Sequence, residues 1–164
     1  MPNWCSNKLT ITRPQADVQV FKTKAVGHSP WEEPEGEPDA LNFHSLVPVP
    51  DEVVKADYGD AGFDWERANW GCKWGAANSV IVEEWEGHAE YSFDTAWSPP
   101  IKFFENLAKQ WPSLTFVLQY EELGMAFKGI AKFKGDTKED HCISLKSKSD
   151  LQPKSTSTRA GCVS

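Results

Sequence analysis

Two short tryptophan-rich motifs contain the residues best suited to binding. Their candidate binding residues are Trp70, Lys73, Trp74, Asp94 and Trp97. Aromatic rings with a lysine and an aspartate at their edge could form a platform that holds a nucleobase or a side chain of a partner. The alternative is that these rings pack an insertion onto a sheet, which is the usual role of buried tryptophans. The sequence leaves both interpretations open.

Catalytic chemistry has a weaker basis in the residues. His88, Glu90 and Asp94 fall on one face of a predicted strand, where contact between them would allow acid–base chemistry. Charged residues that alternate along a strand more often form its solvent-facing side. The chain has no phosphate-binding glycine loop and no nucleophile elbow. We therefore predict no catalytic residues and favour a non-enzymatic role.

The spacing of cysteines and histidines argues against a metal or a cofactor. Four cysteines and four histidines are scattered along the chain, without the close pairs that zinc sites use. The four-cysteine spacing of an iron–sulfur protein is also missing. We predict no metal site and no cofactor.

Length and hydropathy favour a cytoplasmic protein with one domain. The 164 residues suffice for a hydrophobic core without disulfide bonds. No apolar run approaches the roughly 18 residues of a membrane span, so no membrane association is expected. The first seven residues are polar and show no signal-peptide pattern.

Negative charge is concentrated in the middle of the chain. Residues 31–100 carry 16 acidic and 3 basic side chains, whereas the net charge of the whole chain is −7. Such a field repels phosphate backbones, so it disfavours nucleic-acid binding. A solubilising surface is one explanation, and an acidic face directed at a basic partner, such as a nucleic-acid mimic, is the other.

Periodicity predicts an α+β fold. The predicted core elements are a strand at 7–12, a helix from 13 to 27, a hairpin of strands at 80–85 and 88–93, a helix from 101 to 111 that Ser98 caps, and strands at 114–120 and 125–133. Without the last strand this is the ferredoxin-like order βαββαβ, an antiparallel sheet with two helices on one face.

Two segments lie outside this pattern. Residues 28–77 read as an insertion after the first helix, with an acidic, proline-rich loop and a segment at 41–46 that forms a short strand or an ordered edge. After residue 135 no periodicity remains. We therefore predict a domain over residues 1–135 and a disordered tail over 136–164.

Four motifs occur in a specific order, and their residues are 1–7, 43–50, 69–74 and 95–100. Together they resemble the YubB-type ferredoxin-like proteins, which are uncharacterised proteins of phages and plasmids. The resemblance covers about residues 1–135 and implies a ferredoxin-like fold and a mobile-element origin. It implies no activity and no site residues.

Three functions follow as hypotheses. The preferred one is a small protein-binding module that acts on a host protein through an acidic or aromatic face, for example as an inhibitor of a defence or nucleic-acid enzyme. The second is single-stranded nucleic-acid binding through the tryptophan platform. For an RNA-recognition surface, Tyr91 and Phe93 would supply rings on the sheet, but a basic rim is missing. The third is a small enzyme.

Overall fold

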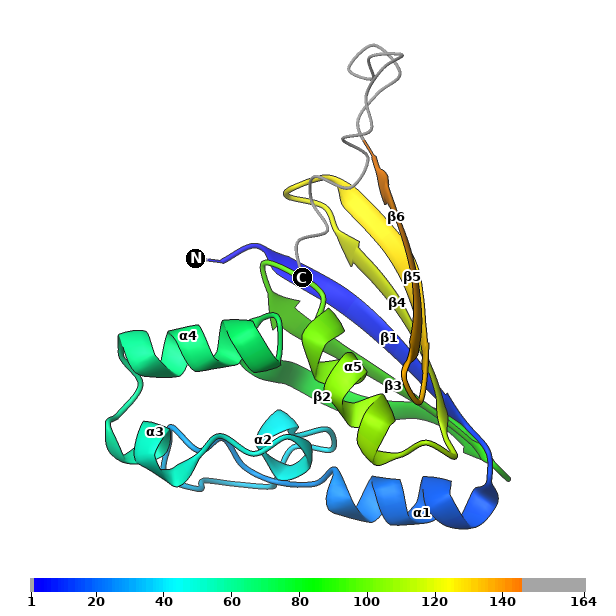
Figure 1. Ribbon diagram of the computed structural model, residues 1–164, viewed down its shortest axis with the longest axis horizontal. Helices are drawn as coiled ribbons and strands as arrows, with labels where there is room; N and C mark the ends of the chain where they lie inside the picture. Colours follow the sequence, from blue (N-terminus) through cyan, green and yellow to red (C-terminus); the bar gives the residue numbers. More distant parts are fainter. Residues whose placement is uncertain (1, 146–164) are drawn as a thin grey trace.

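A computed structural model describes residues 2–145 of the chain. Its centre is a six-stranded antiparallel sheet with the strand order β2-β3-β1-β4-β5-β6 (Figure 1). The strands are β1 (Trp4–Thr12), β2 (Lys73–Trp85), β3 (His88–Ala96), β4 (Thr115–Glu122), β5 (Phe127–Lys134) and β6 (Thr137–Ser144). Strands β2, β3, β1 and β4 lie side by side in this order, with β3 and β1 in the middle. This order confirms the predicted ferredoxin-like arrangement.

In the described part of the chain, five helices accompany the sheet. They are α1 (Gln15–Lys24), α2 (Phe43–Leu46), α3 (Asp51–Lys55), α4 (Asp60–Asn69) and α5 (Ile101–Gln110). Helices α1 and α5 belong to the βαββαβ core, and α2, α3 and α4 form the insertion between α1 and β2. The Phe116 ring of β4 contacts Phe21 of α1 and Phe104 of α5, so both core helices cover the same face of the sheet.

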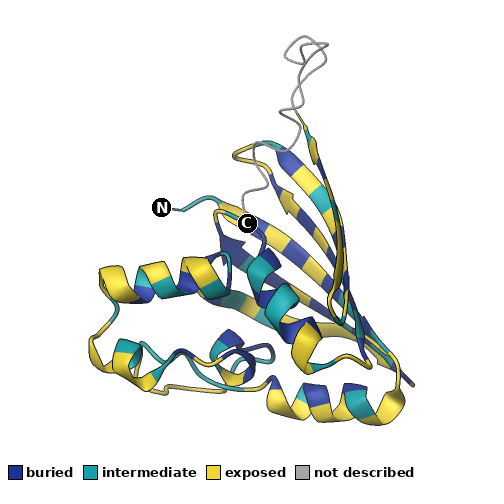
Figure 2. Cartoon of the chain, in the orientation of Figure 1, coloured by how far each residue is buried: buried dark blue, intermediate teal, exposed yellow. Residues whose placement is uncertain are grey.

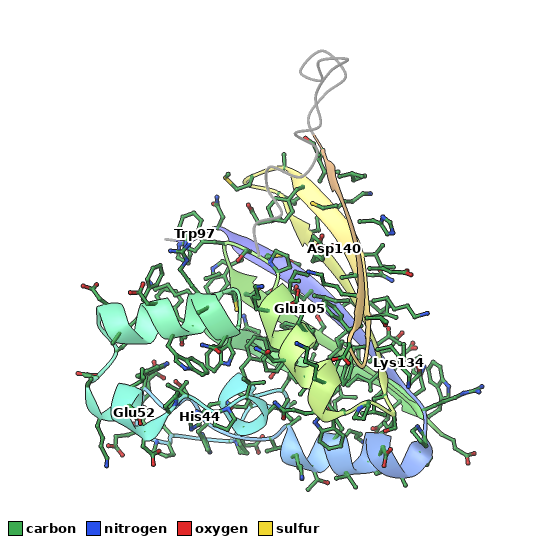
Figure 3. The ribbon with its side chains drawn as sticks, in the orientation of Figure 1. His44, Glu52, Trp97, Glu105, Lys134 and Asp140 are labelled. Carbon is green, nitrogen blue, oxygen red and sulfur yellow. The ribbon has the colours of Figure 1, made fainter. Side chains whose placement is uncertain are left out.

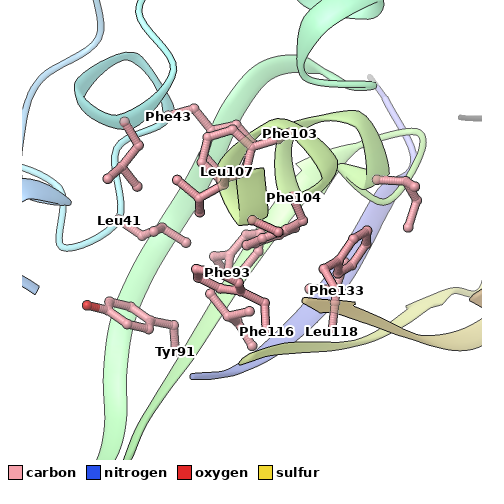
Figure 4. Close-up of a cluster of buried hydrophobic side chains, with 14 of the residues drawn as sticks. Leu41, Phe43, Tyr91, Phe93, Phe103, Phe104, Leu107, Phe116, Leu118 and Phe133 are labelled. Atoms are coloured by element: carbon pink, nitrogen blue, oxygen red, sulfur yellow. The ribbon is translucent and has the colours of Figure 1, made fainter. Parts of the chain in front are cut away.

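The core lies between this face and the helices. Side chains alternate between buried and exposed along β1, β3 and β4, as a sheet covered on one side requires (Figure 2). Aromatic rings fill the space, and Phe43 of the insertion stacks on Phe103 of α5 with ring centroids 3.8 Å apart (Figure 4). The insertion is thereby part of the main core. Tyr91 and Phe93 are buried in it, so the proposed RNA-stacking rings on the open face are wrong.

Strand β6 corrects the predicted end of the domain. The prediction of a disordered tail from residue 136 is wrong for Thr137–Ser144, which pairs with β5 along its whole length. Residues 146–164 of that predicted tail lie outside the described part of the chain. The predicted insertion also ends too late, because β2 begins at Lys73 rather than after residue 77.

Two local predictions are also corrected. The segment at 41–46 contains the short helix α2, whose first turn is capped by Asn42, so the strand interpretation is wrong. Ser98 does not cap α5. Its hydroxyl donates a hydrogen bond of 2.7 Å to the carbonyl oxygen of Gly71, and this bond ties the two tryptophan-rich motifs together.

Within residues 2–145, no helix has the length and apolar character needed to cross a membrane.

Two buried thiols provide a test of this packing. Cys5 and Cys72 are inaccessible, and burial raises the pKa of Cys5 to about 12 and that of Cys72 well above its usual value. Because the thiolate is the reactive form, we expect iodoacetamide at pH 8 to leave both residues unmodified in the native protein and to alkylate both in denaturant. Peptide mass spectrometry reads out each position. Rapid native alkylation of Cys5 would contradict the buried position of β1.

Candidate functional site: a tryptophan-lined cavity

The structure separates the predicted platform into a buried and an exposed part. Trp70 is 1% exposed and belongs to the core, where its indole Nε1 donates a hydrogen bond of 3.1 Å to the carbonyl oxygen of Val47. Trp74 and Trp97 are 45% and 48% exposed. Trp4, which the sequence did not single out, is 41% exposed. The packing interpretation therefore describes Trp70, and a surface platform can contain only the other two predicted tryptophans.

Trp4, Trp74 and Trp97 lie at one end of the sheet, and we call them the tryptophan face. In the strand pairing, Ala96 lies between Trp4 on β1 and Lys73 on β2. Trp97 and Trp74 directly follow these residues, so the three backbones lie within two strand spacings, roughly 10 Å. Figure 3 shows Trp97 beside the start of β1.

Two tryptophans of this face, Trp74 near the start of β2 and Trp97 just after β3, have a left-handed backbone. Trp74 and Trp97 each have φ of 71°. This conformation costs a residue with a side chain about 1–2 kcal/mol relative to the right-handed one. Two hydrogen bonds hold them. The Trp74 amide donates to Oε1 of Glu66 at 2.8 Å, and the Trp97 amide donates to the carbonyl oxygen of Asn3 at 2.8 Å. Surrounding structure that maintains such strain is typical of functional positions.

Lys73 directly precedes Trp74, and Asp94 lies two residues before Ala96 on β3, in different surroundings. The Lys73 ammonium lies 4.2 Å from the centroid of the Trp74 ring, which is a cation–π contact. Asp94 accepts a long hydrogen bond of 3.4 Å from the Asn78 side chain. The two residues are not in direct contact through any hydrogen bond or ion pair found among residues 2–145.

Behind Trp4 and Trp74 the structure contains a cavity of about 550 Å³, which we call the aromatic cavity. It lies between the insertion and the first residues of β2. Aromatic rings that line it come from Trp4, Trp31, Phe43, Tyr58, Trp70 and Trp74. Half of the eight tryptophans of the chain therefore meet in one cavity.

The buried carboxylate of Glu66 fixes the walls of this cavity. Glu66 is 0% exposed. Its Oε2 accepts a hydrogen bond of 2.9 Å from Nε1 of Trp31, and its Oε1 accepts bonds from the Tyr58 hydroxyl at 2.9 Å and the Trp74 amide at 2.8 Å. All three donors belong to residues that line the cavity. Glu66 is therefore a positioning residue for the aromatic rings.

Burial and these donors act on the Glu66 pKa in opposite directions. Burial raises the pKa of the Glu66 carboxyl above its ordinary value, and the three hydrogen bonds offset part of this rise by stabilising the carboxylate. Burial and the nearby Glu66 charge raise the pKa of Tyr58, so its hydroxyl remains a donor at neutral pH. One sign of this role is present in the sequence, because Glu66 occupies the same helical stripe as Phe63 and Trp70, which is an unusual place for an acidic residue.

The residues considered for acid–base chemistry are not assembled into a site. His88 Nε2 lies 3.5 Å from Glu90 Oε1, and the His88 ring stacks on Trp85 with centroids 3.6 Å apart. Asp94 is six residues further along β3, roughly 20 Å from His88. Among residues 2–145, no three His, Cys, Asp or Glu side chains are placed to hold a metal ion.

Comparisons with known proteins agree with the fold. A crystal structure of protein Api92 from Yersinia pseudotuberculosis is similar with a TM-score of 0.70 and 9% sequence identity, over 90% of this chain and 100% of that chain. At this identity the likeness concerns the fold alone. A comparison with curated protein sequences finds no match.

A family model described as the ferredoxin-like domain in Api92-like protein matches residues 69–157. This confirms the ferredoxin-like part of the expected resemblance, whereas the YubB-type assignment stays a prediction. The match begins at the first tryptophan-rich motif and includes the β2–β3 hairpin, α5 and all three strands that follow it. The chain therefore belongs to the family of Api92-like proteins with a ferredoxin-like domain.

Proposed function

We propose that the chain is a protein-binding module that engages a host protein through the tryptophan face. The observation that carries this proposal is the position of Trp74 and Trp97, which are about half exposed on a strained backbone that hydrogen bonds hold in place. Rigid, exposed tryptophans bury a large area on association and lose little conformational entropy, so they are frequent hot spots of protein interfaces.

The charge distribution supports a protein partner over a nucleic acid. Residues 31–100, which include the insertion and β2, carry 16 acidic and 3 basic side chains. A phosphate backbone approaching this region meets repulsion, whereas a basic protein surface is attracted to it. The partner that fits best is therefore a protein with a basic, partly apolar surface.

The resemblance of the chain's motif order to that of YubB-type proteins of phages and plasmids supports the further step to a host target. An acidic protein of a mobile element that binds a basic host surface would act as an inhibitor of a defence or nucleic-acid enzyme, because the binding surfaces of such enzymes for nucleic acid are basic. Base stacking on the tryptophan face is the competing function, and the experiment below separates the two.

The test is capture of partners from host lysate by the tagged full chain, with and without nuclease. We expect a host protein to be retained after nuclease treatment and lost with Trp97→Ala. Truncation of a hot-spot tryptophan weakens binding by about 2 kcal/mol or more, which is roughly thirtyfold. Trp85→Ala is the matched control, because Trp85 is 56% exposed but lies at the opposite end of β2.

If the host protein is no longer retained after nuclease treatment, nucleic-acid binding is the better explanation and this proposal fails. Equal losses with Trp97→Ala and Trp85→Ala would contradict a role for the tryptophan face, since the control residue shares only the ring and its exposure.

A further inference from the structure

We infer that the aromatic cavity binds the alkylammonium side chain of a lysine presented by the protein partner. This inference rests on the proposed function and adds to it the chemistry that the partner must present. It goes beyond the tryptophan face because the aromatic cavity is lined not only by Trp4 and Trp74 but also by residues of the insertion, including Trp31 and Tyr58.

The walls of the cavity suit a cation with an apolar stem. Trp31 and Tyr58 meet edge to face with centroids 5.0 Å apart, and their polar atoms are both directed to Glu66. With the polar edges occupied in this way, the walls present aromatic carbon to a ligand. Aromatic faces attract ammonium groups, and several faces around one space form the aromatic cage that recognises lysine and its methylated forms.

The rim of the cavity is acidic. In the part of the chain that the structure describes, its lining includes the carboxylates of Glu32 and Asp39 and no lysine or arginine. The same two residues also line an adjoining cavity of about 380 Å³, where they are joined by Glu33, Glu35 and Glu37. A lysine in the aromatic cavity would thus have carboxylates at its mouth, and basic residues beside it in the partner would face the acidic loop. A neutral ligand would gain nothing from this charge.

The chain itself shows that one ring of this cavity holds an ammonium group. The Lys73 Nζ lies 4.2 Å from the Trp74 centroid and 5.8 Å from the Phe63 centroid. Lys73 does not line the cavity, and its charge is offset by Glu66, whose pKa it lowers. The acidic rim at Glu32 and Asp39 is contributed by another segment, the loop that precedes α2.

The experiment is a titration of the full chain followed by tryptophan fluorescence and by the NMR signals of the indole N–H groups. The probes are the Nα-acetyl methylamides of lysine, trimethyllysine and norleucine, the last of which matches lysine in its stem but has no charge. We expect both cations to bind and to shift the Trp31 indole signal. We expect norleucine to bind roughly three- to thirtyfold more weakly.

Variants test the rim. The double variant Asp39→Asn and Glu32→Gln is expected to bind the two cationic probes severalfold more weakly and to bind the norleucine probe with unchanged affinity. The two substitutions remove negative charge from the rim and keep the shape of the side chains. Glu86→Gln is the matched control, since Glu86 is an exposed acid in the turn between β2 and β3. Equal affinity for the lysine and norleucine probes, or no binding of any probe up to about 50 mM, would overturn the inference.

The two proposals fail in different ways. If the captured host protein is lost with Trp97→Ala but kept at full affinity with the Asp39→Asn and Glu32→Gln double variant, the tryptophan face is a binding surface and the cavity does not hold a lysine. If lysine probes bind but no host protein depends on Trp97, the cavity inference stands and the proposed function fails.

Discussion

Replacing Glu66 with Gln is expected to lower the free energy of unfolding by about 2–4 kcal/mol, although the change alters only one polar atom. The carboxylate of Glu66 accepts from three donors, and both of its oxygens are used. A glutamine has only one oxygen. If that oxygen faces Tyr58 and the Trp74 amide, its NH₂ group faces the Trp31 indole N–H, and two buried donors are opposed.

Urea unfolding followed by circular dichroism measures this loss. Asp64→Asn is the matched control, because Asp64 lies on the exposed side of the same helix, and its effect is expected within about 0.5 kcal/mol. Combining Glu66→Gln with Trp31→Phe removes one opposed donor, so the double variant is expected to lose less than the sum of the two single changes. Additive losses, or a Glu66→Gln variant as stable as the control, would contradict the role of Glu66 in fixing the cavity.

Only part of the candidate site could be predicted from the sequence. Local clusters of tryptophan with glycine or proline indicated two motifs, and the structure does join them through Ser98 and Gly71. The sequence pattern did not distinguish Trp70, which is buried, from Trp74, which is exposed, because that difference depends on a bulged start of β2. Trp4 was missed for a related reason: its exposure follows from the pairing of β1 with β3, a contact between residues far apart in the chain.

The fold itself was predicted best where local and long-range signals agree. Helix α5 has an apolar stripe and ends before Pro112, and both signals depend only on neighbouring residues. Strand β6 lacks such a signal. It is an edge strand in which only Cys142 is buried, and its sequence is mostly polar, with an exposed Ile143. Backbone pairing with β5 and the hydrogen bond of 2.6 Å from the Tyr120 hydroxyl to Asp140 hold it in place. The sequence of residues 137–144 has no periodicity from which these contacts could be predicted.

Gly129→Ala is expected to detach β6 and to lower the free energy of unfolding by about 3 kcal/mol. Gly129 of β5 lies between Tyr120 of β4 and Cys142 of β6 in the strand pairing. A methyl group at this position would overlap the ring and hydroxyl of Tyr120 and lie 2.6 Å from the carbonyl oxygen of His141. The backbone oxygen belongs to the β6 ladder, so relief of the overlap requires β6 to move.

Amide hydrogen exchange of residues 137–144, together with urea unfolding, measures both effects of this variant. Gly135→Ala serves as the control, because a methyl group there meets no atom within 4 Å and only its φ of 56° resists the change, by roughly 1 kcal/mol. Tyr120→Leu combined with Gly129→Ala should lose less than the two single changes together, since the smaller side chain removes the ring from the overlap. Full protection of the β6 amides in Gly129→Ala would mean that β5 accepts the methyl group without displacing its neighbour, and the close packing of Tyr120 over Gly129 would then not be what holds this edge of the sheet.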